Sequence, residues 1–294
     1  MKKIISRLLL FFIGLPAIVA LVLLFPQYHH LAFNILVVIF SSLGAVELSV
    51  MLAQKQLCIS KAEAAILGAL PPAAMLLTVC FNIRELLLPV VIAVAVSWLL
   101  ISRIFSRSGS LDNFINRFAA GCAALLYPGM LFTWLVRLSR WDNISGIVIL
   151  VFLCTVFAGD SAAWAAGILF GKGNQGIVPV SPNKSVAGYI GGGLASIAVC
   201  AGAAILLPGI LPPQYSYPLL KIPAVAGALL GLATGIAAAL GDLGESAIKR
   251  SSGIKDSGSL IPGRGGVLDS VDSISLAAPV FYIFFSLLFA QPAA

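Results

Sequence analysis

The sequence predicts an all-α, polytopic integral membrane helix bundle, and three observations lead to that prediction. The 294 residues are 60% hydrophobic and only 10% charged, whereas an ordinary soluble domain is about 45–50% apolar and about 25% charged. Apolar runs long enough to cross a bilayer recur along the chain, and the short connections between them carry most of the charges. So few charged residues cannot cover a soluble protein of this size, and lipid is the expected solvent for most of its surface.

Nine segments have the length and apolar character of a membrane-spanning helix, which needs about 20 such residues. They cover residues 8–26, 31–52, 63–82, 86–105, 117–137, 144–170, 186–211, 219–241 and 273–291. Residues 1–142 are expected to form an N-terminal group of transmembrane helices. Residues 143–294 are expected to form a C-terminal transmembrane region with two polar loops, 171–185 and 242–272.

The distribution of basic residues predicts the orientation. Lys2, Lys3 and Arg7 precede the first apolar segment, as in a signal peptide, but that segment is long for one and favours an uncleaved helix. Basic residues in short loops face the cytoplasm. With the N-terminus on that side, the 18 Lys and Arg residues all face the cytoplasm except Arg84, Arg137, Arg140 and Lys221. The N-terminus and both polar loops are therefore expected in the cytoplasm, at a bacterial cytoplasmic membrane.

Composition also limits the partners and the chemistry. The basic residues behind the net charge of +7 fall mostly in the short loops, where they set the membrane orientation. Membrane lipids are therefore expected partners, and nucleic acid is not. None of the five cysteines forms a C-x-x-C pair, and the only two histidines are adjacent. A Cys or His metal site and a Ser-His-Asp triad have little to be built from. A homodimer stays open.

Acidic residues in segment 242–272 follow helical spacing. Asp242 and Glu245 are three residues apart, and so are Asp269 and Asp272, so each pair shares a helix face. Mg²⁺ takes oxygen ligands, commonly one or two carboxylates plus substrate phosphates. Nearby cations can neutralise phosphate oxygens, and these are Lys249, Arg250, Lys255 and Arg264. From spacing alone, helix caps and ion pairs explain these residues slightly better.

The same segment resembles the signature of the CDP-diacylglycerol synthases, or phosphatidate cytidylyltransferases. That signature reads S-x-x-K-R, four residues, K-D, and then P-G-H-G-G-x-x-D-R-x-D. Here the three parts are 246–250, 255–256 and 262–272, and all spacings hold over 27 residues. Arg264 stands where the family has His, and Ser270 stands where it has Arg.

Two further stretches resemble the same family, so that the resemblance covers about 155–290. Residues 158–172 resemble A-x-D-x-x-A-Y…F-G-K/R, and residues 181–192 resemble S-P-x-K-[TS]…G-G. Asp160 is notable independently, because an Asp inside an apolar helix costs about 2.5–3.5 kcal/mol on insertion scales and usually lines a polar cavity. Glu47 is a weaker case, since it lies near the end of its helix.

The resemblance implies that CTP and phosphatidic acid give CDP-diacylglycerol and pyrophosphate, in phospholipid biosynthesis. It implies Mg²⁺ as the cofactor, and a second metal ion or a monovalent cation beside it stays open. The expected metal ligands are Asp242, Asp269 and Asp272. The other residues of the expected catalytic group are Lys249, Arg250, Lys255 and Asp256. The residues expected to bind substrates are Asp160, Ser181, Lys184, Ser185, Ser246, Arg264, Gly265 and Gly266.

Three other hypotheses stay open. A CTP-dependent lipid kinase would use a similar site but transfer the γ-phosphate. A family member that binds nucleotide or lipid without turnover is compatible with Arg264 and Ser270. A transporter would carry midplane polar residues in two matching halves, whereas the charges here gather in the C-terminal half. A CDP-alcohol phosphotransferase is disfavoured, because its D-x-x-D-G-x-x-A-R core is absent.

Overall fold

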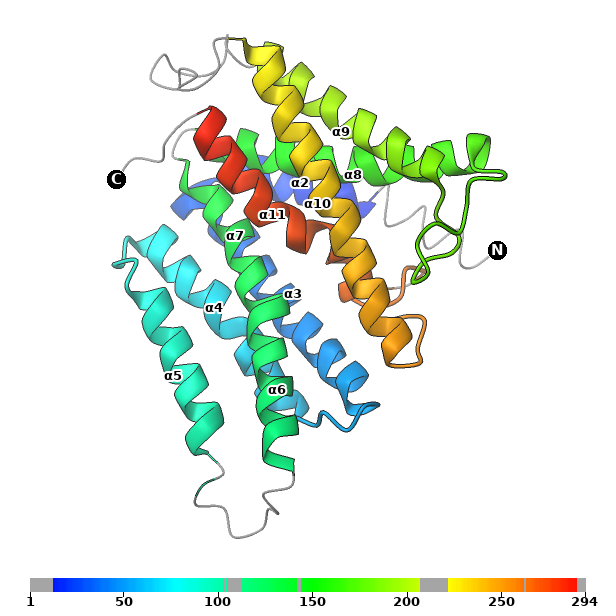
Figure 1. The fold of residues 1–294 in the computed structure, drawn as a ribbon. Helices are drawn as coiled ribbons and strands as arrows, with labels where there is room; N and C mark the ends of the chain where they lie inside the picture. Colours follow the sequence, from blue (N-terminus) through cyan, green and yellow to red (C-terminus); the bar gives the residue numbers. More distant parts are fainter. Residues whose placement is uncertain are drawn as a thin grey trace. The chain divides into compact units, whose positions relative to one another are not determined.

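The computed structural model describes residues 13–102, 104, 113–141, 144–206, 222–261 and 263–289, and the regular elements in these ranges are helices (Figure 1). Seven of the described helices are long and apolar enough to cross a membrane. The all-α prediction is confirmed, and the chain is an integral, multi-pass membrane protein. The seven are α3 (Gln27–Ala53), α4 (Lys61–Phe81), the continuous segment Phe114–Arg140, α8 (Ser145–Phe170), α9 (Val186–Leu206), α10 (Pro223–Ser251) and α11 (Leu268–Leu288).

The other two predicted spans correspond to shorter helices. Span 86–105 contains α5 (Leu87–Ile101), an apolar helix of 15 residues. Span 8–26 contains α2 (Leu15–Leu24), and its residues before Ile13 lie outside the described ranges. Six of the cations used for the orientation also lie outside them, namely Lys2, Lys3, Arg7, Arg103, Arg107 and Lys221.

The contacts within the chain divide it into two compact units. Unit 1 comprises Met1–Ser139 and Ile248–Val271, and unit 2 comprises Arg140–Ala247 and Asp272–Ala294. The chain therefore passes from unit 2 to unit 1 within α10, and back to unit 2 within α11. Each unit has its own core.

In unit 1, α3, α4 and α5 pack with α6 (Phe114–Ala124) around small and branched side chains. A Cβ atom on Gly68 of α4 would overlap Ala45 of α3, and one on Gly121 of α6 would overlap Leu99 of α5. Small residues of this kind let membrane helices approach closely. The buried centre of the cluster consists of Ala45, Ala64, Leu67, Ala95, Leu99, Ala124 and Leu125.

Pro72 inside α4 leaves a carbonyl group that a side chain of α3 satisfies. Pro72 has no N–H to donate to the carbonyl of Gly68, and the Ser41 hydroxyl lies 2.6 Å from that oxygen. The same hydroxyl lies 3.0 Å from the carbonyl of Pro128, in the π-helical turn η3 (Leu125–Met130) that joins α6 to α7 (Leu131–Arg137). Within a membrane, backbone groups need such internal partners because no water replaces them.

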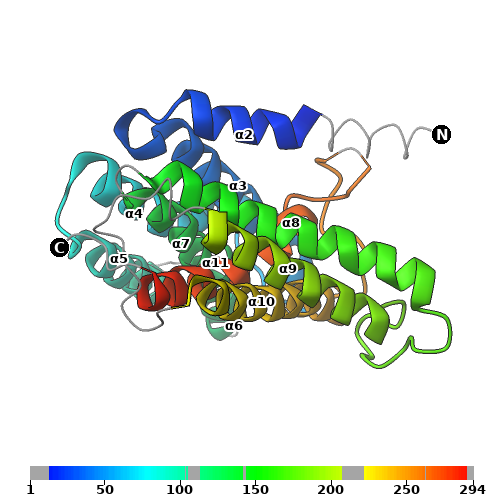
Figure 2. The same ribbon diagram turned by 90° about the horizontal axis from the view of Figure 1, so that it is seen from above.

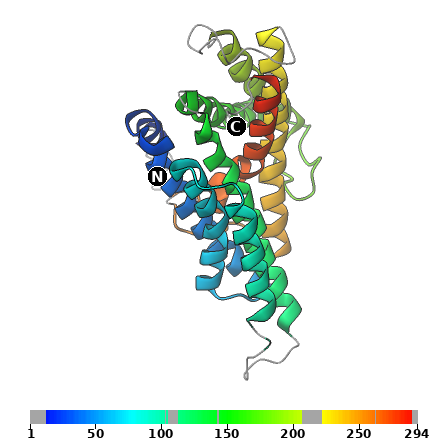
Figure 3. The same ribbon diagram turned by 90° about the vertical axis from the view of Figure 1, so that its left-hand side faces the viewer.

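Unit 2 is built on α8 and α9, which run side by side (Figure 2). A Cβ atom on Gly192 would lie only 2.9 Å from the carbonyl oxygen of Gly159, so this contact requires glycine. The α10 and α11 helices also run side by side in this unit (Figure 3), and a Cβ atom on Gly241 would lie 2.5 Å from the carbonyl oxygen of Asp272. Phe152 and Phe281 pack edge to face with centroids 5.2 Å apart.

The structure changes the boundaries of one predicted loop. Helix α8 ends at Phe170 and α9 begins at Val186, which leaves residues 171–185 as the first polar connection. The second predicted loop, 242–272, is helical at both ends, so that only residues 252–267 connect α10 to α11. Polar residues continue α10 beyond its apolar part, because nothing interrupts the helix before Gly253.

Gly253 ends α10 with a Schellman motif. Its φ is +72°, a conformation that glycine adopts without steric cost. The N–H of Ile254 donates to the carbonyl of Lys249 at 3.0 Å, and the N–H of Gly253 donates to that of Arg250 at 3.1 Å. These are the two bonds that define the motif. Lys249 and Arg250 therefore occupy the last turn of α10, where cations favour the helix dipole.

Candidate active site

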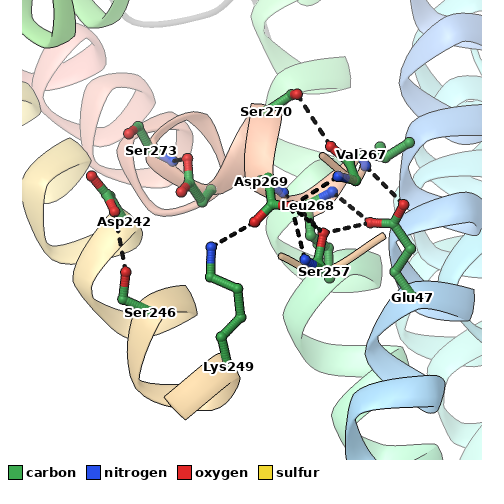
Figure 4. A network of polar contacts seen from close by, with 12 residues as sticks. Glu47, Asp242, Ser246, Lys249, Ser257, Val267, Leu268, Asp269, Ser270 and Ser273 are labelled. Carbon is green, nitrogen blue, oxygen red and sulfur yellow. Dashed lines mark hydrogen bonds and ion pairs between the residues drawn. The ribbon is translucent and has the colours of Figure 1, made fainter. Parts of the chain in front are cut away.

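An ion pair joins the last turns of α10 to the first turn of α11 in unit 1 (Figure 4). Lys249 Nζ lies 2.5 Å from Asp269 Oδ1, and the two side chains are only 13% and 7% exposed. Asp269 Oδ2 accepts hydrogen bonds from the backbone N–H groups of Ser257 and Gly266, each at 2.8 Å. Charged hydrogen bonds from several directions fix a carboxylate in one orientation. Two residues of the predicted catalytic group are thus brought together.

The Gly265–Gly266 pair lets the backbone pass close to carboxylates of the protein itself. Gly265 has a φ of +114°, and a Cβ atom there would overlap Asp269 Oδ2. A Cβ atom on Gly266 would overlap Ser257 Oγ and Glu47 Oε2. The sequence predicts that this pair approaches a ligand. In unit 1 its close neighbours are side chains of the chain itself, and contact with a substrate stays a prediction.

Glu47 of α3 is a site neighbour that the sequence analysis does not assign. Its Oε1 accepts from Val267 N at 2.8 Å, and its Oε2 accepts from Leu268 N at 2.9 Å. The carboxylate therefore caps the start of α11, where the N–H groups have no intrahelical acceptor. The signal for this residue is the one that identifies Asp160, an acidic side chain inside an apolar helix. Its distance from the signature in sequence hides the contact.

Unit 2 contains a second lysine–aspartate pair. Lys184, in connection 171–185, forms an ion pair with Asp242 Oδ2 on α10, and these side chains are 27% and 32% exposed. Lys184 Nζ also lies 5.8 Å from the centroid of the Tyr189 ring in the first turn of α9. Ser246 Oγ lies 3.5 Å from Asp242 Oδ1, one turn further along α10 (Figure 4). Three predicted site residues, Lys184, Asp242 and Ser246, are therefore neighbours.

Local hydrogen bonds position the lysine of this pair. The N–H of Lys184 donates to the carbonyl of Ser181 at 3.1 Å, which closes a tight turn before α9. Ser185 is buried, and its Oγ accepts the N–H of Gly188 at 3.1 Å, as an N-cap residue does. Ser181 and Ser185 are predicted to bind substrate, and that role stays a prediction beside these structural ones.

Asp160 lies near the start of the last helix, also in unit 2. Ser273 Oγ of α11 lies 3.4 Å from Asp160 Oδ1 of α8. The preceding residue, Asp272, accepts the N–H of Ser273 at its Oδ1 at 2.6 Å. Because the α10 and α11 backbones approach closely at Gly241 and Asp272, Asp242 and Asp272 stand on adjoining helices. The contact with Ser273 indicates that the Asp160 carboxylate faces another helix of unit 2 rather than lipid.

Exposed charges lie on the connection 252–267 and at the end of α10. The side chains of Arg250, Lys255, Asp256 and Arg264 are exposed. Ser270, which replaces the family arginine, turns back on its own helix, and its Oγ donates to the carbonyl of Gly266 at 3.2 Å. Its hydroxyl carries no charge, whereas Arg250, Lys255 and Arg264 are exposed cations near it in the sequence.

The acidic residues can be compared with what Mg²⁺ requires. In the described part of the chain, no group of three or more His, Cys, Asp or Glu side chains is arranged to hold a metal ion. Mg²⁺ commonly needs only one or two carboxylates, with water and phosphate oxygens completing its shell. Asp242 and Asp272 are carboxylates on adjoining helices of unit 2, and a metal ion at Asp242 would have to displace the ammonium of Lys184. A metal ion at Asp269 would have to displace the ammonium of Lys249.

The comparison with protein families decides the assignment of the chain. Residues 5–288 match the model of the cytidylyltransferase family. The chain belongs to this family. The match includes the N-terminal helices as well as the signature, so α3 and its Glu47 fall within the family fold.

Several relatives carry the name phosphatidate cytidylyltransferase. The one from Synechocystis sp. is 41% identical over 143 residues, which are 48% of this chain and 44% of that protein. The one from Bacillus subtilis is 35% identical over 166 residues, or 56% of each chain. The one from Brucella suis is 36% identical over 194 residues, which are 60% of this chain and 67% of that protein. The chain spans about half the length of the first two relatives.

Three polar residues that contact predicted site residues have no clear signal in the sequence. Ser257 follows the Lys255-Asp256 part of the signature, Ser273 follows Asp272, and Tyr189 lies in an apolar helix. Serine and tyrosine are common in such positions, and only the folded chain shows that each contacts a charged side chain.

Proposed function

We propose that this chain transfers the cytidylyl group of CTP to phosphatidic acid, releasing pyrophosphate and forming CDP-diacylglycerol. Membership of the cytidylyltransferase family and the names of its relatives support the proposal. The observation that carries it is the pairing of two aspartates of the predicted site with lysines. Asp242 lies beside Lys184, and Asp269 lies beside Lys249. Paired carboxylates and ammonium groups are the usual surroundings of a transferred phosphoryl group.

The chemistry places few demands on acid–base catalysis. A phosphate oxygen of the lipid attacks the α-phosphorus of CTP, a new O–P bond forms, and the bond from the α-phosphorus to the β-phosphate oxygen breaks. Pyrophosphate leaves with that electron pair. The attacking oxygen is already anionic near neutral pH, so positioning and charge neutralisation supply most of the rate enhancement. The replacement of the family histidine by Arg264 is compatible with such a mechanism.

In unit 1, Lys249 is the residue that we assign to phosphate neutralisation. Asp269 holds its ammonium in place, and the carboxylate is itself fixed by the N–H groups of Ser257 and Gly266. An ammonium group held in advance spends little free energy on reorientation when an anion binds. Arg250 and Arg264, both exposed, add charge that attracts CTP or the lipid phosphate.

In unit 2, we assign Asp242 and Asp272 to Mg²⁺, with Lys184 as a phosphate-binding residue. Mg²⁺, when bound, would neutralise charge on the phosphate oxygens of the nucleotide. The Lys184 side chain is 27% exposed and lies beside Tyr189, so its ammonium can turn from Asp242 to a phosphate without unfolding any element. The metal role of Asp269 and the roles of Lys255 and Asp256 stay predictions.

The membrane orientation belongs to the same proposal. The bias of Lys and Arg supports a cytoplasmic position for connections 171–185 and 252–267. CTP is a cytoplasmic nucleotide, whereas the lipid tails of phosphatidic acid remain in the bilayer. A site at the cytoplasmic boundary reaches both substrates. Cysteine labelling of Ser259→Cys from either side of sealed vesicles would test this orientation, since Ser259 is an exposed residue of that connection.

The activity is tested with purified protein, phosphatidic acid, Mg²⁺ and CTP labelled at the α-phosphate. We expect labelled CDP-diacylglycerol and an equal amount of pyrophosphate, and no product from the folded fraction of Asp269→Asn. Label at the γ-phosphate instead reports the competing lipid kinase reaction. The proposal is wrong if well-folded wild-type protein makes no CDP-diacylglycerol with CTP or dCTP.

A further inference from the structure

We infer that Glu47 is a positioning residue for Asp269, acting through Ser257 and the first turn of α11. For its effect on turnover the inference rests on the proposed function, whereas its structural part stands on contacts within unit 1. Glu47 lies on α3, more than 200 residues before the groups that it contacts. A carboxylate of the membrane helix α3 therefore contacts residues of the signature segment.

The donors around Glu47 require a carboxylate rather than a neutral amide. Its two oxygens accept from Val267 N, from Leu268 N and from Ser257 Oγ, at 2.8, 2.9 and 2.9 Å. A carboxylate has acceptor sites on both oxygens, whereas a glutamine side chain has one acceptor oxygen and one donor NH₂ group. Glutamine at this position would turn an N–H group toward a backbone N–H group. A buried donor left without an acceptor is costly.

Ser257 connects the two carboxylates. Its Oγ lies 2.9 Å from Glu47 Oε2 and 3.0 Å from Asp269 Oδ2, and it has one proton to donate. The backbone N–H of the same residue donates to Asp269 Oδ2 at 2.8 Å. Any displacement of Ser257 therefore moves the partners of Asp269. Through that carboxylate it also moves Lys249, the group that neutralises phosphate.

The backbone around Glu47 follows its shape closely. A Cβ atom on Gly258 would lie 2.6 Å from Glu47 Oε1, and one on Gly266 would overlap Oε2. The connection 252–267 thus passes the carboxylate twice, once at Gly258 and once at Gly266. Contacts with Glu47 therefore help to hold this connection in its conformation.

Apolar packing holds α3 itself in place beside α11. Leu48 and Met51, which follow Glu47 on α3, form a buried cluster with Leu268. A Cβ atom on Gly44 would lie 3.0 Å from Leu268 Cδ2. Helix α3 therefore packs directly against Leu268, the residue that precedes Asp269. A rigid support of this kind is what a precisely placed catalytic group needs.

The experiment compares Glu47→Gln with Glu63→Gln in detergent-solubilised full-length protein. Glu63 forms a mostly buried ion pair with Arg117 in the same unit, so its variant loses a carboxylate of similar burial outside the site. We expect Glu47→Gln to lower kcat about 10–100-fold, the usual effect of removing a supporting residue, with the KM for CTP nearly unchanged. Glu63→Gln lowers the melting temperature but keeps its kcat.

Two further measurements separate positioning from general stability. Ser257→Ala is expected to lower kcat in the same way, and the double variant with Glu47→Gln is expected to lose less than the product of the two effects, because both act on one chain of contacts. Amide hydrogen exchange in the peptide covering 257–270 is expected to rise in Glu47→Gln and to stay unchanged in Glu63→Gln.

Each outcome decides the inference. A kcat of Glu47→Gln close to that of wild type would overturn it, and so would multiplicative effects in the double variant. Unchanged exchange in peptide 257–270 would overturn it as well. If wild-type protein makes no CDP-diacylglycerol, the proposed function fails, and the exchange measurement alone then decides whether Glu47 holds the connection in place.

Discussion

Gly266 and Glu47 are so close that a single methyl group on the glycine would overlap the carboxylate oxygen Oε2. The same methyl group would overlap Ser257 Oγ. The backbone N–H of Ser257 donates to Asp269, and the Ser257 hydroxyl contacts Glu47. The glycine pair of the signature is therefore required by the packing of the protein's own carboxylates, whatever else it contacts when a substrate binds.

We expect Gly266→Ala to abolish measurable turnover and to cost about 1–3 kcal/mol of stability, as overpacking usually does. The backbone cannot yield, because Val267 and Leu268 next to it are held by Glu47. Turnover with labelled CTP and thermal unfolding in detergent measure the two effects. Gly202→Ala is the matched control, since a Cβ atom on Gly202 meets nothing within 4 Å. Wild-type turnover in Gly266→Ala would contradict this account.

The sequence predicts the fold well because its strongest signal is the length of apolar runs. The spans around α8 and α9 agree with the structure to within a few residues at the ends next to connection 171–185. The end of α10 is predicted less well, because polar residues such as Asp242 and Lys249 read as a loop in hydropathy although their spacing is helical. The Schellman glycine, Gly253, marks the actual end.

The site is predicted in part, for a physical reason. Residues that lie close in sequence, such as Asp269 and Asp272, are found by their spacing. Lys249 and Asp269 are found by resemblance, but their ion pair depends on how α10 and α11 are brought together. Glu47 contributes through three-dimensional contact alone. One sequence can show that an acidic residue lies in an apolar helix, but it cannot show which segment that residue supports.

The Lys249–Asp269 pair leads to a prediction that separates stability from activity. Removing one partner of a buried ion pair costs about 3–5 kcal/mol, because the remaining charge stays buried. We expect Lys249→Met to show such a loss, together with loss of turnover. Adding Asp269→Asn to Lys249→Met removes the unpaired charge and is expected to restore most of the stability without restoring activity.

Thermal unfolding and turnover of both variants in the same detergent give the answer. The amide oxygen of asparagine can still accept the N–H groups of Ser257 and Gly266, so the double variant keeps a partner for the backbone. A double variant no more stable than Lys249→Met would show that Lys249 stabilises unit 1 by other contacts. Activity in either variant would remove Lys249 from the mechanism.

The Lys184–Asp242 pair is expected to behave differently because it is about a third exposed. Exposed ion pairs contribute only about 0–1 kcal/mol to stability. We therefore expect Lys184→Ala to leave the melting temperature nearly unchanged. Loss of a charged hydrogen bond to a phosphate costs about 1.5–3 kcal/mol, so the KM for CTP should rise about tenfold or more. An unchanged KM and kcat would show that Lys184 serves only to pair with Asp242.

Arg264 and Ser270 provide the last prediction, which concerns the two departures from the family signature. Ser270 donates to the carbonyl of Gly266 and lacks the charge of the family arginine, whereas Arg264 is exposed on the same connection. We expect Arg264→Ala to reduce kcat/KM for CTP about tenfold, the effect of losing one charged contact of about 1.4 kcal/mol. Ser270→Arg in that background is expected to restore much of the loss.

The salt dependence of Arg264→Ala distinguishes a direct role from a structural one. An exposed charge acts through solvent and is screened as ionic strength rises, with a Debye length of about 10 Å at 0.1 M and about 3 Å at 1 M. The difference between wild type and Arg264→Ala should therefore shrink at high salt, while Lys55→Ala, which removes an exposed cation elsewhere in unit 1, shows no difference at either salt concentration. An equal effect of both variants would mean that net charge attracts CTP, and that position 264 has no special part in replacing the missing arginine.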